Sequence, residues 1–550
     1  MKIFVKVVAS VVVTTTIFSC TPIFATNDNP INNSQNVTFD KKIGINGFID
    51  CKFDNIKACG IFRENHNFCT TFDYNSKKCY FKSSSYDFDQ FYKNLYLSGI
   101  AVIPSIQQSF DKDNKENKPI EDDADTLKPE SYKIHSNVLF NYAARYGNSK
   151  VDKNKLNITQ GTEPITGLGY IQYYENWNEP DKTKFGDKAH FSAEEFAAMC
   201  SADYDGHEGS LGNTYGIKQA DLTSKLVLGG ISTDTNPVEY LDKIKSWSDE
   251  NRKSKTLPFD VINFQYYSED KSPESSEFIS KVNDVIKWRN DNAPNKEIWI
   301  SGFGWDTNIS SSNGTPSADT QRDWIVREFL LSDRLGLDKA IVNSSRDSSN
   351  ASSSSPLVTS GLTTQKGKED RKSSWYGVNT LKNTLSGFIF SGVVKEESNL
   401  YIYKYINPTT AEDCFVLWSP ADNNNKIDDY ELNVGENSGV TLVQMQNNNE
   451  FGVSSNLDVN DSKVSVNVSE SPIFVKVSPS NKMLTLGKTK VESVPDTNYQ
   501  NVNPSNKDYA SPNTDSQQEK VNNSDNMTLK QLGFIGSLLS LVSFLGLIFI

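Results

Sequence analysis

The feature that most constrains the fold is an alternation of short apolar runs with helix-like segments between residues 43 and 385. The apolar runs are nearly continuous rather than alternating in polarity, which is typical of strands covered on both faces. The expected strands are 43–49, 58–63, 99–106, 170–177, 225–232, 259–267, 297–303 and 339–345. Eight such strands with intervening helices predict an α/β fold, a (β/α)8 TIM barrel over residues 40–385.

Helices are expected between these strands where apolar residues recur at helical spacing. The expected helices are 131–147, 192–204, 238–251, 275–291 and 317–336. Ser192, with Glu195 three residues later, is a capping-box start. The charged segment 111–130 predicts a surface loop insertion.

The pattern changes after residue 385, where short alternating strands are separated by Asn-rich turns. It predicts a small all-β sandwich over residues 386–482. Residues 487–528 are rich in Asn, Ser, Pro and Asp and have almost no apolar content, which predicts a disordered stalk. A chain of 550 residues is longer than one hydrophobic core supports, so a second domain agrees with the length.

Both ends of the chain are typical of processing signals. Residues 1–25 have a charged start, an apolar middle and a small-residue end, which predicts a secretory signal peptide. A lipoprotein signal ending at Cys20 is the alternative. The apolar tail 532–550 predicts either a GPI-attachment signal or a retained membrane anchor. We therefore expect a secreted protein held on the outer face of the plasma membrane.

Charge and cysteines agree with an exported protein. The net charge of −13 repels phosphate backbones, so nucleic acid is not an expected partner. Four cysteines lie close together and predict two local disulfides in an oxidising compartment; they are Cys51, Cys59, Cys69 and Cys79. A zinc site is the alternative, but no CxxC pair is present. Acceptor triplets for N-glycosylation occur at Asn36, Asn157, Asn308, Asn313, Asn343, Asn350 and Asn467.

The stretch IQYYENWNEPDK, residues 171–182, carries the main candidate for chemistry. Asn178 and Glu179 follow the fourth expected strand, and the C-terminal ends of barrel strands line the active site. A partly buried carboxylic acid beside an amide suits protonation of a glycosidic oxygen. The alternative is an ordinary turn that ends the strand.

The sequence WNEP at 177–180, in a barrel of this layout, resembles the retaining glycoside hydrolases of clan A, above all their family-39-like and family-5-like members. Further stretches in the same order resemble such enzymes: FREN (62–65), AARYG (143–147), MCSADYDGHEGSLG (199–212), NFQYY (263–267), GFGWDTN (302–308) and SSWYGVNTLKNTLSGF (373–388). The resemblance covers about residues 43–480. It implies a glycosidase that acts on β-linked oligo- or polysaccharides without a metal ion or cofactor.

The resemblance also implies roles for single residues. Glu179 matches the general acid/base, and Asn178 matches the amide that contacts the sugar's 2-hydroxyl. The nucleophile of these enzymes is a Glu at the end of strand seven, but this sequence has Gly302 there. Gln265 stands where related barrels often have His. Position 302 is therefore expected to be a vacant nucleophile position.

A retaining mechanism needs two carboxyl groups about 5–5.5 Å apart, and glycine supplies none. Asp306 is a candidate substitute that could activate water in an inverting reaction, although it could simply hold its loop. The substrate-binding candidates are Asn178, Trp177, Arg63, Gln265, Tyr267 and Trp305, with Tyr173 and Tyr266 as further aromatic rings. Three hypotheses remain open: a glycosidase, an inactive carbohydrate-binding relative, and a structural coat protein.

Overall fold

The computed structural model describes residues 37–480, except 68–70, 108–116, 122, 184–187, 308–315, 349–356 and 423. The predicted signal peptide, stalk and C-terminal tail lie outside the described residues. Among the helices of the described ranges, none is long and apolar enough to cross a bilayer.

The N-terminal part is a closed barrel of parallel strands, as predicted. The strand order around it is β1-β10-β9-β8-β7-β6-β5-β2. The strands are β1 (Ile43–Gly47), β2 (Ile61–Asn67), β5 (Ala101–Gln107), β6 (Tyr173–Glu175), β7 (Lys225–Val227), β8 (Val261–Gln265), β9 (Glu297–Gly302) and β10 (Lys339–Val342). A small antiparallel hairpin, β3 (Phe72–Asp73) and β4 (Lys78–Cys79), is inserted after β2.

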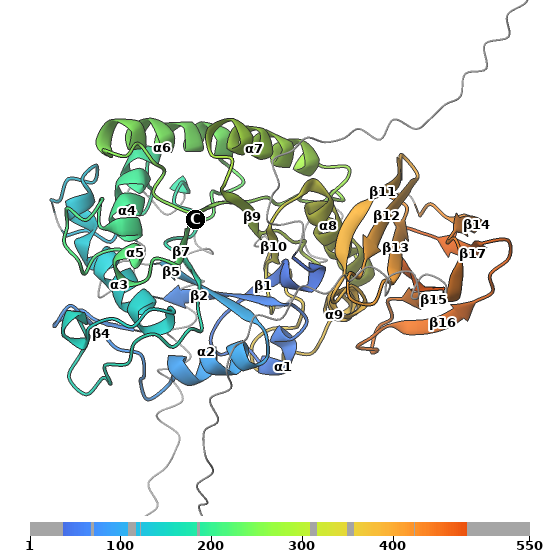
Figure 1. Ribbon diagram of the computed structural model, residues 1–550, viewed down its shortest axis with the longest axis horizontal. Coiled ribbons are helices and arrows are strands. Elements are labelled where there is room, and N and C mark those ends of the chain that lie inside the picture. Colours follow the sequence, from blue (N-terminus) through green and yellow to red (C-terminus); the bar gives the residue numbers. More distant parts are fainter. Residues whose placement is uncertain are drawn as a thin grey trace, which may run out of the picture.

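Helices surround the barrel (Figure 1). They are α1 (Phe53–Ile56), α2 (Phe88–Leu97), α3 (Lys133–Tyr146), α4 (Ala193–Asp205), α5 (Ile217–Ala220), α6 (Pro237–Asn251), α7 (Phe278–Asn292), α8 (Ala318–Leu335) and α9 (Ser373–Thr384). The predicted capping box at α4 is present, because the Ser192 side chain accepts from the Glu195 N–H and Glu195 accepts from the Ser192 N–H.

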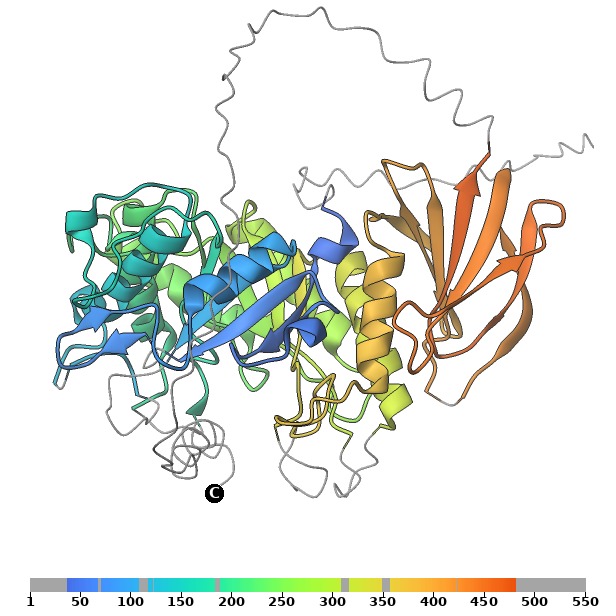
Figure 2. The same ribbon diagram turned by 90° about the horizontal axis from the view of Figure 1, so that it is seen from below.

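The C-terminal part is the predicted all-β domain. A six-stranded antiparallel sheet has the order β11-β12-β13-β18-β15-β16, and β14 pairs with β17. The strands are β11 (Ile389–Glu397), β12 (Leu400–Ile406), β13 (Asp413–Trp418), β14 (Ile427–Asn433), β15 (Asn437–Gln444), β16 (Val453–Leu457), β17 (Lys463–Val468) and β18 (Ile473–Pro479). Figures 1 and 2 show α8 and α9 between the barrel and this domain.

The cysteine prediction is wrong for the residues that the structure describes. Cys51, Cys59 and Cys79 are free and buried, and Cys69 lies outside the described residues. Each thiol belongs to a different local packing environment: the Cys51 sulfur accepts from Phe48 N and lies 3.0 Å from Ser345 Oγ, whereas Cys79 lies in β4. Burial raises the pKa of the Cys51 and Cys59 thiols, to about 12 for Cys59.

Candidate active site

The barrel interior is filled in layers along the strands. A middle layer consists of Ile61, Ile103, Val227, Val261, Trp299 and Ile341. Side chains alternate along a strand, so the next inward position of β2 after Ile61 is Arg63. The layer above is polar, and it forms the floor of the barrel mouth at the C-terminal ends of the strands.

A buried ion pair between Arg63 and Glu175 dominates this polar floor. Arg63 Nε lies 2.5 Å from Glu175 Oε2 and Nη2 lies 2.7 Å from Oε1, in a two-pronged arrangement. Asn263 Nδ2 donates to Glu175 Oε1 at 3.1 Å, and the Gly230 N–H donates at 3.2 Å. Both charged groups are almost fully excluded from solvent, so each one compensates the other.

Sequence reasoning missed Glu175, which is the last residue of β6. The sequence does contain a pattern that points to Glu175. Glu175 is two positions after Tyr173, so both side chains face the barrel interior. A carboxylate at an inward position requires a buried cation, and Arg63 on β2 is that cation. Because β2 begins three residues later than predicted, Arg63 lies inside the strand and not at its end.

Asn178, a predicted substrate-binding residue, follows β6 and is held by two donors. Its Oδ1 accepts from Arg63 Nη2 at 2.9 Å and from Gln265 Nε2 at 2.8 Å. A parallel bridge between Asn178 and Gly230 extends the β6–β7 pairing beyond the end of β6. The structure thus brings Arg63, Asn178 and Gln265 together, and among the described residues the Asn178 Nδ2 group has no acceptor.

Glu179 follows in the left-handed backbone region, at φ 48°, with its N–H bonded to Gly230 O. Its Oε1 lies 2.7 Å from Lys182 Nζ, and both side chains are mostly buried. A general acid must carry a proton that it can give to a leaving oxygen. The Glu179 carboxyl group is bonded to Lys182, so this contact must open before the carboxyl group can reach a leaving oxygen.

The space beside Gly302, the position predicted to lack a nucleophile, is filled by neighbouring side chains. A Cβ added at Gly302 would lie 2.7 Å from Gln265 Oε1, 2.8 Å from Gln265 Cδ and 2.9 Å from the Tyr267 hydroxyl. These separations are shorter than ordinary carbon contacts. The amide of Gln265 and the phenol of Tyr267 therefore occupy the space that a side chain at position 302 would need.

Tyr267 is fixed in this place by its own contacts. Its hydroxyl accepts from Asn343 Nδ2 at 3.1 Å and donates to Gln265 Oε1 at 3.4 Å. Burial raises the pKa of Tyr267 above its usual range, and the charge of Glu179 raises it further. Tyr267 therefore stays a neutral hydrogen-bonding group close to Glu179.

Asp306 holds a loop in the structure. Its Oδ1 accepts from the Thr359 N–H at 3.1 Å and from the Thr359 hydroxyl. The neighbouring Lys372 donates to Thr359 O and to Asp347. These bonds tie the segment after β9 to the segment before α9, which agrees with the loop-holding alternative for Asp306.

Three of the aromatic residues predicted to bind the sugar do not face the barrel mouth, so the prediction is wrong for them. Trp177 is 5% exposed and packs edge-on against Phe191, while Trp305 is fully buried against Trp324. Tyr173 lies at the other end of the barrel, where its hydroxyl donates to Glu297 at the start of β9. Trp177 and Trp305 follow their strands and pack on Phe191, just before α4, and on Trp324 of α8, whereas Tyr173 lies within β6 and faces the barrel interior.

The sequence matches no protein-family model and no curated protein. Solved structures do match. A family 39 glycoside hydrolase from Bacteroides cellulosilyticus WH2 is 14% identical with a TM-score of 0.56, over 82% of this chain and 83% of that one. A GH30 endoxylanase from Clostridium papyrosolvens C71 is 12% identical with a TM-score of 0.52, over 82% and 98%.

A family 44 xyloglucanase from Paenibacillus polymyxa is 9% identical with a TM-score of 0.51, over 82% of this chain and 98% of that one. At such low identities the likeness establishes the arrangement of the chain and not its chemistry. This chain has the barrel-and-sandwich fold of glycoside hydrolases of families 39, 30 and 44, in agreement with its resemblance to clan A.

Proposed function

We propose that this protein binds glycans at the barrel mouth and does not hydrolyse them by the retaining two-carboxylate route. The observation that carries the proposal is the filling of the space beside Gly302 by Gln265 and Tyr267. A retaining glycosidase needs a carboxylate there to attack the anomeric carbon. An amide and a phenol can donate and accept hydrogen bonds but cannot form the glycosyl intermediate.

The rest of the mouth supports binding over turnover. Glu179 is paired with Lys182, and Asp306 is bonded to Thr359. The Arg63–Glu175 pair holds the Asn178 amide in one orientation, so its free Nδ2 group is preorganised to donate to a hydroxyl. Because the charges here are paired, the mouth suits a neutral sugar better than a charged one.

The test is a binding and hydrolysis panel of aryl β-glycosides and β-linked oligosaccharides. Two of the similar structures are an endoxylanase and a xyloglucanase, so xylo- and gluco-oligosaccharides are the first probes. We expect binding without turnover by the parent protein. Binding should weaken about tenfold or more in Gln265→Ala, since a central polar contact is removed.

A set of related variants distinguishes a protein that lacks hydrolytic activity from one that has lost its fold. Gly302→Glu alone should stay inactive, because Gln265 occupies the position of the new side chain. Gly302→Glu combined with Gln265→Ala and Tyr267→Phe removes both groups that crowd the new carboxylate. This triple variant should gain hydrolysis, which requires Glu179 to leave Lys182 and which Glu179→Gln then abolishes. Turnover by the parent that disappears in Glu179→Gln would overturn the proposal and establish a glycosidase. Absence of any glycan binding would favour a structural coat protein.

Export and surface attachment are part of the same proposal. They are supported by the signal-like residues 1–25 and by the apolar tail 532–550. Treatment of intact cells with a phosphatidylinositol-specific phospholipase C should release the protein if the tail is a GPI signal. Release by detergent alone would indicate a retained membrane anchor, and recovery from the cytosol would contradict export.

A further inference from the structure

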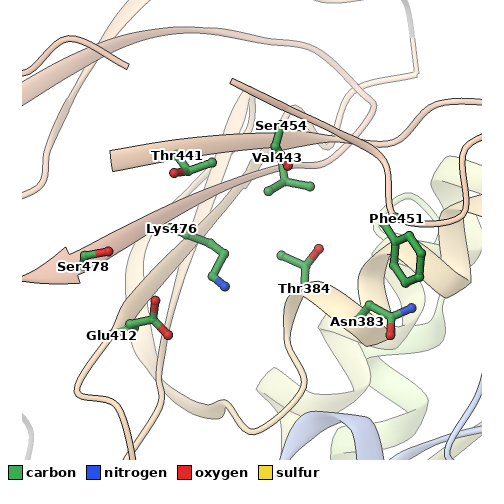
Figure 3. A pocket seen from close by; sticks show the side chains of 9 residues that line it. All are labelled: Asn383, Thr384, Glu412, Thr441, Val443, Phe451, Ser454, Lys476 and Ser478. Carbon is green, nitrogen blue, oxygen red and sulfur yellow. The ribbon is translucent and has the colours of Figure 1, made fainter. Parts of the chain in front are cut away.

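A groove of about 290 Å³ lies between the end of α9 and the face of the six-stranded sheet that is turned toward α9 (Figure 3). Thr384 ends α9, Lys476 lies on β18, and Glu412 immediately precedes β13. Figure 3 shows these three side chains directed toward one space from three separate segments. None of them belongs to the barrel mouth.

The strand pattern explains why Lys476 points into the groove. Val475 and Val477, its neighbours on β18, belong to the core between the two sheets of the β domain. Because side chains alternate along a strand, Lys476 must face the opposite side, toward α9. Its ammonium lies 5.5 Å from the centre of the Phe388 ring.

The groove offers both donors and acceptors. One oxygen of Glu412 accepts from the Thr410 hydroxyl at 2.9 Å, which leaves the other oxygen available. The hydroxyls of Thr441, Ser454 and Ser478 line the groove. A hydroxyl can donate and accept, so a set of this kind matches a ligand that also carries hydroxyls in close succession.

An exposed aromatic ring stands at the rim of the groove. Phe451 is 64% exposed, which is unusual for so large an apolar side chain. The hairpin that carries it is fixed to α9, because Asn379 Nδ2 donates to Glu450 O at 2.6 Å and Arg371 pairs with Glu450. The backbone that carries the ring is therefore held beside the polar groove, so binding costs little backbone entropy there.

We propose that this groove is a saccharide-binding site separate from the barrel mouth, which takes one pyranose unit of a neutral glycan. The hydroxyls, Lys476 and Glu412 would bond the sugar hydroxyls, while Phe451 covers the apolar C–H face of the ring. A phosphorylated ligand fits less well, because Glu412 and the net charge of −13 repel it. With the mouth, the groove would give two contacts to one polysaccharide and raise avidity.

The test uses the full chain with xylotetraose, cellotetraose and a wider panel of neutral oligosaccharides. Binding is followed by saturation-transfer NMR, and its location by hydrogen exchange of the 444–457 hairpin. We expect a bound sugar to protect this hairpin from exchange. Phe451→Ala should weaken that binding about tenfold or more, and Lys476→Gln should weaken it less because Gln still donates a hydrogen bond.

Two matched variants make the outcome decisive. Tyr96→Ala removes another exposed aromatic ring, 52% exposed on α2, and should leave groove binding unchanged. Gln265→Ala should weaken binding at the mouth and leave protection of the hairpin intact, so the two sites can fail independently. The proposal is overturned if no sugar of the panel protects the hairpin at millimolar concentration, or if protection survives Phe451→Ala undiminished. It is equally overturned if inorganic phosphate protects the hairpin and the sugars do not.

Discussion

At the scale of single residues, the candidate site is determined by what fills the space next to a glycine. The sequence at position 302 indicates only that a carboxylate is missing. The structure adds that Gln265, bonded to Asn178, and Tyr267, bonded to Asn343, occupy the gap. A side chain at position 302 would therefore have to displace the ends of Gln265 and Tyr267.

Gly302→Ala tests this packing directly. The new methyl group would lie 2.7 Å from Gln265 Oε1 and 2.9 Å from the Tyr267 hydroxyl, so both side chains must shift, and the shift of Gln265 strains its bond to Asn178. Overpacking of this kind costs about 1–3 kcal/mol, and the midpoint of thermal unfolding should fall. Gly439→Ala is the matched control, because nothing lies within 4 Å of its added Cβ. A Gly302→Ala midpoint equal to that of the control would show that the space is free.

The two glutamates of the ENWNE stretch should differ sharply in their contribution to stability. Glu175→Gln leaves the buried charge of Arg63 without its counter-ion, which costs about 3–5 kcal/mol. Glu179→Gln breaks only the Lys182 pair at the mouth, where water can replace the lost partner, and should cost about 1 kcal/mol or less. Urea unfolding of both variants measures the difference, and equal losses would contradict the assignment of Glu175 to the buried pair.

At the scale of elements, continuous apolar runs predicted all eight barrel strands, because a strand covered on both faces must be apolar throughout. The same rule misplaced the ends of some strands. Polar residues at inward positions near the mouth, such as Arg63 on β2, look like the end of a strand in sequence. Arg63 meets its partner Glu175 only through the closure of the barrel, across a separation of 112 positions, so local patterns could not reveal the pair.

Of the predicted site residues, the structure brings some together at the barrel mouth and places others elsewhere. Asn178 and Gln265 follow β6 and end β8, and closure of the barrel brings them within hydrogen-bond distance. The orientations of Trp177 and Trp305 depend on residues in or next to the surrounding helices. The pattern of a single strand cannot predict these contacts. Phe191 and Trp324 cover these rings and remove them from the mouth.

The connection from β10 to α9 should give the protein a measurable pH dependence. Asp347 in this connection accepts from the Gly361 N–H and from Lys372 Nζ. Burial raises the pKa of Asp347 from 3.8 to about 6, although Lys372 opposes the shift. The folded state therefore binds the proton more tightly than the unfolded chain does. The resulting stabilisation is complete below about pH 3.8 and is lost as the pH rises through about 6.

Comparison of the parent with Asp347→Asn isolates this contribution. The free energy of unfolding of the parent minus that of the variant should fall between pH 4 and 6 and stay constant above that range. The charge of Asp306 adds to the upward shift of the Asp347 pKa, so Asp306→Asn should move the fall to lower pH. A difference that rises with pH over this interval would contradict the proposed environment of Asp347.

At the scale of the whole molecule, one buried charge cluster joins the barrel to the β domain. Glu274, in the connection between β8 and α7, binds Arg327 of α8 through two nitrogens at 2.6–3.1 Å. The same carboxylate accepts from Trp418 Nε1 of β13 at 2.7 Å, and Arg327 donates to Pro420 O at 3.0 Å. The two parts therefore share polar groups that neither could satisfy alone, and we expect them to unfold as one unit.

Glu274→Gln should uncouple the two parts. The substitution removes the charge that compensates fully buried Arg327, and Asp422, 3.7 Å from Arg327, replaces it only in part because it is more exposed. Removing one partner of a buried ion pair costs about 3–5 kcal/mol. Here this cost weakens the contact between the barrel and the β domain. Calorimetry should show one transition for the parent and two for Glu274→Gln, with the β domain melting first because its core is the smaller.

Glu277→Gln is the matched control, since Glu277 pairs with Lys281 at 3.9 Å on the surface of the same segment. Its thermogram should superimpose on that of the parent. If Glu274→Gln also superimposes, the junction does not depend on the cluster and the two parts are held together by apolar packing alone. A split transition would also predict weaker sugar binding in the groove between α9 and the sheet, because that groove exists only while the β domain stays docked on the helix.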